Sequence, residues 1–339
     1  MSSFLFYLCG DHNKASSRVR GYWIIEALLS LGNRCSTEYH HSKAALVSFL
    51  IRIPFHDVIV FQKTYSRWHC LLLRWASLLN KTTLLDLDDA PSRTNSPVTL
   101  RNVEYMMRRV SIVTVGSRFL QDYASQFSKD VRLIPSSIRL SNYHPIDKKD
   151  KDTATICLGW IGNGAHYKQD LIEVLKAPLT RIAKETPFRF KVIGACSEEA
   201  LYQAFSGISG LQMDFVDTIE WSDPDAVSLA LSDVNIGLYP LLLNDFNQYK
   251  CGFKALEYMA MGIPVISSDI AENREIIEQG VTGLFAKCEE EWVDSIRYLL
   301  TQKAKREEIG ANGRCKVEAQ YSIALSAKSI LAAIQEREN

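Results

Sequence analysis

Short apolar runs alternate with amphipathic segments of helical length along the whole chain. Five apolar runs of strand length lie in the first half, at residues 4–9, 57–62, 83–87, 112–115 and 131–134. Segments with helical periodicity separate them, at residues 20–31, 67–79, 97–108 and 118–127. Strands that alternate with helices predict a parallel sheet covered by helices on both faces.

The alternation stops at a polar stretch rich in lysine and aspartate, residues 147–155, and then begins again. The apolar runs of the second half lie at residues 156–161, 188–193, 213–216, 234–238 and 264–267. We therefore predict two α/β domains, residues 1–148 and 149–322, with a last helix at 323–339 that packs back on the first domain. Parallel sheets of this kind bind ligands beyond the carboxyl ends of their strands, so residues that directly follow strands are the candidate ligand-binding residues.

Composition limits the class of partner. Lysine plus arginine and aspartate plus glutamate each number 39, so the chain has no net field to attract nucleic acid and any anion site is local. Eight scattered cysteines without a C-x-x-C pair are typical of a reduced, cytoplasmic protein without a structural zinc site. Residues 44–55 are apolar and interrupted by Arg52; a core helix is the favoured interpretation, and contact with a membrane surface is the alternative.

The stretch from Lys250 to Asp269 carries the strongest chemical signal. Gly252 lies where a loop enters a helix, and Gly262 marks the end of that helix. The free N–H groups of a helix N-terminus bind anions, and Lys250 and Lys254 would add charge for a diphosphate.

Glu257 follows one helical turn later, where its carboxylate could accept two hydroxyl groups of a ribose. The alternative is a surface ion pair between Lys254 and Glu257, which would contribute only about a few tenths of a kcal/mol. Two lysines at the start of a helix oppose the helix dipole, which favours the functional interpretation.

A second candidate patch follows the first strand of the second half. Gly162 and Gly164 would let the backbone approach a phosphate, and Lys168 could reach it as a point charge. A plain turn is the alternative, since glycines after a strand are common in α/β proteins.

The first half of the chain carries less specific signals of function. Asp88 and Asp89 end an apolar strand, and we expect them to border the ligand cleft. Binding of a metal ion and capping of a turn are the alternatives. Arg18 and Arg20 begin a helix whose dipole they oppose, which indicates either an anionic ligand or two solvated side chains.

The segment around Glu257 resembles the nucleotide-sugar signature of glycosyltransferases with the GT-B fold, above all the retaining family 4, also called group 1. The positions that match the signature are Leu256, Glu257, Met259, Ala260, Gly262, Pro264 and Val265. The resemblance implies that Glu257 holds the ribose of the donor. Lys168 matches a family lysine that binds the diphosphate. Two positions depart from the family: Tyr249 replaces a glutamate that contacts the donor sugar, and Asn163 replaces an arginine that binds the diphosphate.

The resemblance also implies a GT-B fold, with two Rossmann-like, doubly wound parallel-sheet domains that face a central cleft. Gly162, Asn163 and Gly252 would lie at the nucleotide and its phosphates. The candidate contacts of the donor or acceptor sugar are Asp88, Asp89, Tyr249, Phe253, Arg18 and Arg20. Lys168, Lys250, Lys254 and the helix N-terminus would stabilise the leaving diphosphate without a metal or another cofactor. In that family the departing phosphate oxygen helps to deprotonate the acceptor, so no catalytic base is assigned.

The function expected from the resemblance is transfer of a hexose from a nucleoside diphosphate sugar to a hydroxyl of a carbohydrate or glycolipid. The role would be bacterial-type polysaccharide or glycoconjugate synthesis, in the cytoplasm or peripherally at the inner face of the membrane. The alternative is a non-catalytic GT-B protein that binds a nucleotide or a partner chain, which the departures at Tyr249 and Asn163 favour.

Overall fold

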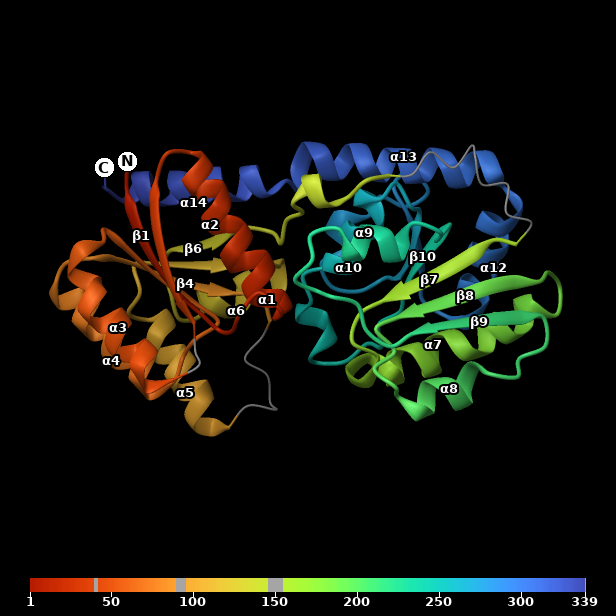
Figure 1. Cartoon of the computed structure of the whole chain (residues 1–339), viewed down its shortest axis with the longest axis horizontal. Coiled ribbons are helices and arrows are strands. Elements are labelled where there is room, and N and C mark those ends of the chain that lie inside the picture. The colour runs from red at the N-terminus through yellow and green to blue at the C-terminus, as the bar shows by residue number, and fades with distance from the viewer. Residues whose placement is uncertain (40–41, 90–95, 146–154, 339) are drawn as a thin grey trace. The chain divides into compact units, whose positions relative to one another are not determined.

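The computed structural model describes residues 1–39, 42–89, 96–145 and 155–338. The chain forms two compact units. Unit 1 comprises Met1–Ser137, Gln248–Cys251 and Tyr321–Asn339, and unit 2 comprises Ile138–Asn247 and Gly252–Gln320. The linker predicted at residues 147–155 lies outside the described residues except for its last position. Each unit has its own six-stranded sheet (Figure 1).

The sheet of unit 1 has six parallel strands in the order β2-β1-β3-β4-β5-β6. Their bounds are β1 Ser3–Leu8, β2 Arg34–Tyr39, β3 Val58–Gln62, β4 Thr82–Leu87, β5 Ile112–Val115 and β6 Val131–Leu133. The sequence predicted all of these except β2. This strand lies at the edge of the sheet and has a polar, partly exposed sequence, so it lacks the apolar run of a central strand.

The helices of unit 1 connect these strands and cover both faces of the sheet. They are α1 Ala15–Ser17, α2 Trp23–Ser30, α3 Lys43–Arg52, α4 Arg67–Leu78, α5 Pro97–Met107, α6 Arg118–Ser125 and α14 Ile323–Glu338. A π-helical stretch, η1 Arg18–Tyr22, joins α1 to α2, and a 3₁₀ turn, η2 Ile53–Phe55, follows α3.

Alternation along β1 divides the core of unit 1 into two layers. Leu5 and Tyr7 face a cluster formed with α3 to α6, whereas Phe4, Phe6 and Leu8 face α2 and α14 on the other side. The last helix of the chain therefore packs beside the helix that follows the first strand (Figure 1).

The sheet of unit 2 also has six parallel strands, in the order β12-β11-β10-β7-β8-β9. Their bounds are β7 Cys157–Ile161, β8 Phe188–Ile193, β9 Leu211–Val216, β10 Ile236–Tyr239, β11 Val265–Ser268 and β12 Leu284–Ala286. The sequence did not predict β12, a short edge strand of three residues.

The helices of unit 2 are α7 Gly164–Ala183, α8 Glu199–Phe205, α9 Ala226–Leu231, α10 Phe253–Ala260, α11 Asn273–Ile276, α12 Glu289–Thr301 and α13 Lys303–Gln320. The 3₁₀ turns are η3 Leu140–Asn142 and, in the segment that crosses between the units, η5 Asn247–Tyr249. None of the helices in the described part of the chain combines the length and apolar character that a membrane-spanning helix needs.

Candidate functional site

The strand order of unit 2 identifies the edge of the sheet where a ligand is expected. The chain proceeds outwards from β7 in one direction to β8 and β9, and in the other direction to β10, β11 and β12. The order therefore reverses between β7 and β10, and open α/β sheets bind ligands at the carboxyl ends of the strands at such a point. Gly162 directly follows β7, and Tyr239 is the last residue of β10.

The loop after β7 is packed against the loop after β8. The Gly162 and Gly164 amides donate to the Ile193 and Gly194 carbonyls, over 2.9 and 2.7 Å. A Cβ at Gly164 would lie 2.6 Å from the Ala195 carbonyl oxygen. This glycine is thus required for packing of the protein itself, a role that the sequence did not distinguish from approach to a phosphate.

Asn163 and Lys168 both have partners within unit 2. The Asn163 side chain accepts a hydrogen bond from the His166 amide over 3.0 Å and so caps the N-terminus of α7. The Lys168 ammonium lies 3.1 Å from a Glu198 carboxylate oxygen. The residue in the place of the family arginine is therefore a helix cap, and the charge of Lys168 is compensated.

Helix α10 is held against β7 and β10 by one buried tyrosine. The Tyr258 hydroxyl accepts from the Ile161 amide over 3.1 Å and lies within hydrogen-bonding distance of the carbonyls of Gly159 and Leu238. Gly252 precedes the helix with a φ of 66°, and Gly262 follows it with a φ of 64°. The predicted helix end at Gly262 is confirmed, and these contacts place the first turn of α10 at the carboxyl edge of the sheet.

Lys254 extends from this first turn across the ends of both central strands. A Cβ on Gly162 would lie 2.6 Å from Lys254 Cε, so the glycine leaves the space that the lysine side chain occupies. The ammonium is 3.9 Å from the ring centre of Tyr167, 5.5 Å from that of Tyr239 and 5.7 Å from that of Trp160. Aromatic rings attract a cation without neutralising its charge, so this ammonium is suited to bind an anion.

Glu257 lies one turn further along α10 and is buried. Its Oε1 accepts a hydrogen bond from the Tyr143 hydroxyl over 3.0 Å. Arg314 in turn donates to the Tyr143 carbonyl over 3.1 Å, which fixes the backbone of that residue. Since Tyr143 is far from Glu257 in the sequence, no local pattern indicated this partner.

The residues just before Gly252 pack with unit 1. The Tyr249 ring lies near Phe119 and Tyr123, with ring centres 6.3 and 6.4 Å away in edge-on geometry. The Tyr249 carbonyl accepts from the Ser117 hydroxyl over 3.2 Å. The tyrosine in the place of the family glutamate is therefore packed among aromatic side chains of unit 1.

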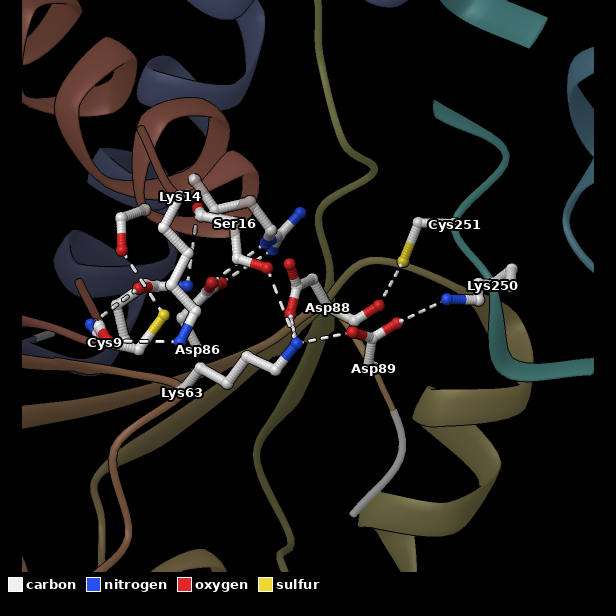
Figure 2. A network of polar contacts seen from close by, with 12 residues as sticks. Cys9, Lys14, Ser16, Lys63, Asp86, Asp88, Asp89, Lys250 and Cys251 are labelled. Atoms are coloured by element: carbon white, nitrogen blue, oxygen red, sulfur yellow. Dashed lines mark hydrogen bonds and ion pairs between the residues drawn. The ribbon is translucent and has the colours of Figure 1, made fainter. Parts of the chain in front are cut away.

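Lys250 and Cys251 join a charged cluster at the carboxyl edge of the unit 1 sheet (Figure 2). The Lys63 ammonium lies between Asp88 and Asp89, 3.0 Å from Asp88 Oδ1. Lys250 approaches Asp89 to 3.6 Å, and the Cys251 thiol donates to the Asp88 carbonyl over 2.9 Å. Two lysines and two aspartates thus balance one another.

The two members at the centre of this cluster are charged at neutral pH. Burial by itself would raise the pKa of Asp88, but Lys63, a Ser16 hydrogen bond and Arg20 lower it to about 2. Burial disfavours the charge of Lys63, and the carboxylates of Asp88 and Asp89 reverse this and raise its pKa. No group of three or more histidine, cysteine, aspartate or glutamate side chains within the described ranges is arranged to hold a metal ion.

Arg18 and Arg20 have different environments although they are two residues apart. Arg18 is partly exposed and donates to the His12 carbonyl over 3.1 Å. Arg20 is buried and donates to both Asp86 carboxylate oxygens, over 2.8 and 2.6 Å, and to the Ile134 carbonyl over 2.9 Å. The sequence suggested that Arg20 binds an anionic ligand or is solvated. The structure shows neither, because the Arg20 guanidinium is buried in an ion pair with Asp86.

Residues 155–302, most of unit 2, match the family model described as Glycosyl transferases group 1. This matched part is a glycosyltransferase group 1 domain. The family named from the sequence is confirmed, and with it the enzyme class, glycosyltransferase. The loop after β7, Lys168, Lys254 and Glu257 all lie within the matched part of this group 1 domain.

The whole chain is similar in fold to several solved glycosyltransferases. HepE of Anabaena in complex with UDP is 13% identical, with a TM-score of 0.77 over 99% of this chain and 100% of that chain. A glycosyltransferase from Rickettsia africae is 13% identical, with a TM-score of 0.77 over 100% and 99%. Sucrose-phosphate synthase from Thermosynechococcus elongatus is 17% identical, with a TM-score of 0.73 over 99% of each chain. The GT-B fold that the sequence predicted is confirmed, although no curated protein matches the chain by sequence.

The sequence did not identify several side chains that lie at the carboxyl edges of the two sheets or contact the candidate residues. They are Lys63, Tyr143, Glu198 and the aromatic residues around Lys254. Lys63 directly follows β3 and adopts a φ of 49°, which is unusual for a lysine. Its position after a strand was a signal that could have drawn attention to it. The partners of Lys168, Lys254 and Glu257 are distant in sequence, so only the packed structure shows them.

Proposed function

We propose that the chain transfers a sugar from a nucleoside diphosphate sugar to an acceptor hydroxyl, with retention of configuration and without a metal ion. The observation that carries the proposal is the Lys254 ammonium beside Gly162, at the switch point of a glycosyltransferase group 1 domain. HepE has been crystallised with UDP-glucose, so UDP-glucose is the first donor to test.

The reaction breaks the bond between the anomeric carbon and the donor phosphate oxygen and forms a bond from that carbon to the acceptor oxygen. The acceptor proton goes to the departing diphosphate. Negative charge on the diphosphate grows as the bond breaks, so cations placed beforehand around it stabilise the transition state. Lys254 and the N-terminus of α10 supply this stabilisation, with Lys168 as a second cation once it leaves Glu198. Lys250 is left out because it pairs with Asp89 in unit 1.

Glu257 is the proposed ligand of the donor ribose, and the Tyr143 hydrogen bond orients its carboxylate. Glu257→Gln keeps the volume and an acceptor for Tyr143 but removes the charge. We expect it to weaken UDP binding by about 10-fold, because a hydrogen bond to a charged group contributes about 1.5–3 kcal/mol. Titration calorimetry with UDP measures this, with Glu278→Gln at an exposed position as the matched control. Equal affinities of wild type and Glu257→Gln would contradict the ribose role.

The activity itself is tested with a panel of UDP, GDP and ADP sugars, by release of the nucleoside diphosphate. Because lysines and a helix N-terminus meet the phosphate charge, we expect turnover with at least one donor to persist in excess EDTA. Complete loss on chelation, restored by added Mg²⁺ or Mn²⁺, would contradict the metal-independent mechanism. Analysis of the product anomer by NMR tests retention.

A second candidate function is nucleotide binding without transfer. The packing of Tyr249 against Phe119 and Tyr123 favours it, because the sugar-contacting glutamate of the family is replaced by a partly buried side chain that packs against aromatic rings of unit 1. Under this alternative, UDP would bind with a requirement for Glu257, and no donor of the panel would be hydrolysed or transferred.

We further propose a carbohydrate or glycolipid acceptor and a role in polysaccharide or glycoconjugate synthesis, in the cytoplasm and in contact with a membrane. An acceptor carried on a lipid would place the reaction at a bilayer surface.

A further inference from the structure

Two neighbouring helices of unit 1, α3 and α4, expose large apolar side chains. They are Val47, Leu50 and Ile51 of α3, Phe55 of the η2 turn after it, and Trp68, Leu71, Trp75 and Leu78 of α4. Their exposed fractions range from 39% to 75%. We call these eight residues the apolar face. A contiguous exposed apolar patch of this kind marks an interaction site more often than scattered apolar residues do.

Each helix is apolar on two sides. Phe49 of α3 and Leu72, Leu73 and Ala76 of α4 point into the core and are buried. The exposed residues of α4 recur at intervals of three and four, so they form a second stripe along the helix. A surface helix of a soluble protein normally carries polar residues on that side. The sequence predicted a core helix at residues 44–55, but only one side of α3 is in the core.

The two stripes lie next to each other, because α3 packs against α4, and α4 against α5 (Figure 1). The apolar face is thus one surface of unit 1 rather than two separate stripes. It includes two tryptophans, which favour the boundary between lipid headgroups and acyl chains.

All the charges carried by these helices are positive. Lys43, Arg52, Arg67 and Arg74 are their charged residues, and neither helix nor the η2 turn contains an aspartate or glutamate. Lys43, Arg67 and Arg74 are exposed, and the Arg67 guanidinium lies 5.3 Å from the ring centre of Trp68. Arg52 pairs with Glu38. In a chain with equal numbers of acidic and basic residues, this face is selectively basic.

We propose that the apolar face docks unit 1 on the surface of an anionic lipid bilayer. Apolar and aromatic side chains flanked by basic ones describe helices that lie in the membrane interface, where burial of apolar area and attraction to anionic headgroups act together. A protein partner would have to supply an acidic, apolar surface, whereas an anionic bilayer supplies both properties everywhere. The proposal rests on the membrane contact that belongs to the proposed function and assigns it a surface, but it does not depend on sugar transfer, since none of these residues belongs to the donor site of unit 2.

The test is co-sedimentation of the full chain with vesicles of phosphatidylcholine alone or with about a quarter phosphatidylglycerol. We expect binding to the anionic vesicles and at least 10-fold weaker partitioning to the neutral ones. Arg67→Gln with Arg74→Gln should lower partitioning on anionic vesicles by about 10-fold, and high salt should do the same. Ile51→Ser with Leu78→Ser should lower it by about 10-fold or more, because less apolar area is buried.

Matched controls lie on other elements. Leu229→Ser with Leu243→Ser removes two equally exposed leucines of unit 2, and Lys184→Gln with Lys328→Gln removes two exposed charges outside α3 and α4. Both controls should bind anionic vesicles like the wild type. Absence of vesicle binding, or equal losses in the controls, would overturn the proposal. Self-association that Ile51→Ser with Leu78→Ser abolishes, without vesicle binding, would assign the face to a second copy instead.

Donor hydrolysis in solution distinguishes this test from that of the proposed function. The apolar-face variants should hydrolyse the donor at the wild-type rate, since they leave unit 2 unchanged. Binding to anionic vesicles without turnover of any donor would support the membrane proposal and contradict the catalytic one.

Discussion

Lys254→Ala should lower kcat/KM for sugar transfer by about 100-fold or more. Removal of one group that stabilises developing negative charge costs about 10²–10³ in rate, and Lys254 is the cation that the structure places at the switch point without a carboxylate partner within the described residues. Steady-state kinetics with the best donor of the panel measure the loss, and thermal melts confirm that the variant is folded. A loss below about 3-fold would remove Lys254 from the mechanism.

The matched control is Lys168→Ala, which removes a lysine that Glu198 already compensates. It should cost less than Lys254→Ala. The departure at Asn163 offers a sharper test, since the family has an arginine there. Adding Asn163→Arg to Lys254→Ala should restore part of the rate, because it returns a cation to the loop after β7. The same change removes the cap of α7, which costs about 0.5–2 kcal/mol of stability. A recovery of activity would therefore come from the restored positive charge and not from a more stable protein.

Arg20→Ala should destabilise unit 1 by about 3–5 kcal/mol. The variant leaves the Asp86 carboxylate buried without its cation, although the Thr114 hydroxyl still donates to it over 2.6 Å. Removal of one member of a buried ion pair leaves an uncompensated charge, which accounts for the size of the effect. Hydrogen exchange of the β4 and β5 amides measures it and reports on unit 1 separately from unit 2.

Two comparisons show whether the buried charge is the cause. Arg18→Ala removes a partly exposed arginine two residues away and should change stability by less than about 1 kcal/mol. Arg20→Met with Asp86→Leu removes both charges and should be less destabilising than Arg20→Ala alone. If the double variant is the less stable one, the hydrogen bonds to Ile134 and Thr114 outweigh the charge pair.

The secondary structure was predictable for strands that are buried on both faces and for elements whose apolar residues recur at regular intervals. The strands β5 and β8 were predicted with the bounds that the structure has. All four residues of β5 are buried, as in a strand covered on both faces, whereas β8 begins with buried phenylalanines that alternate with the partly exposed Arg189 and Lys191. The edge strands β2 and β12 were not predicted, because an edge strand is less covered by other elements and therefore does not require an apolar run. The glycine at the end of α10 was predictable for a local reason, a positive φ that glycine adopts without strain.

The candidate site was predictable only in part. Its glycines, lysines and Glu257 were identified from their positions after strands and at a helix start, and from the family signature. Their partners were not, because Tyr143, Glu198 and Tyr239 come from other elements and no sequence spacing relates them to the site.

By itself, the sequence determined the α/β class, most strands and the glycosyltransferase family, and it indicated the candidate donor site. These depend on local periodicity and on short motifs. Only the tertiary structure decided what each cation does: Lys250 and Lys254 are four residues apart, yet Lys250 pairs with Asp89 of unit 1 and Lys254 lies over aromatic rings of unit 2. The physical reason is that the charge available to a ligand depends on which side chains long-range packing brings within a few ångströms, and local sequence does not contain that information.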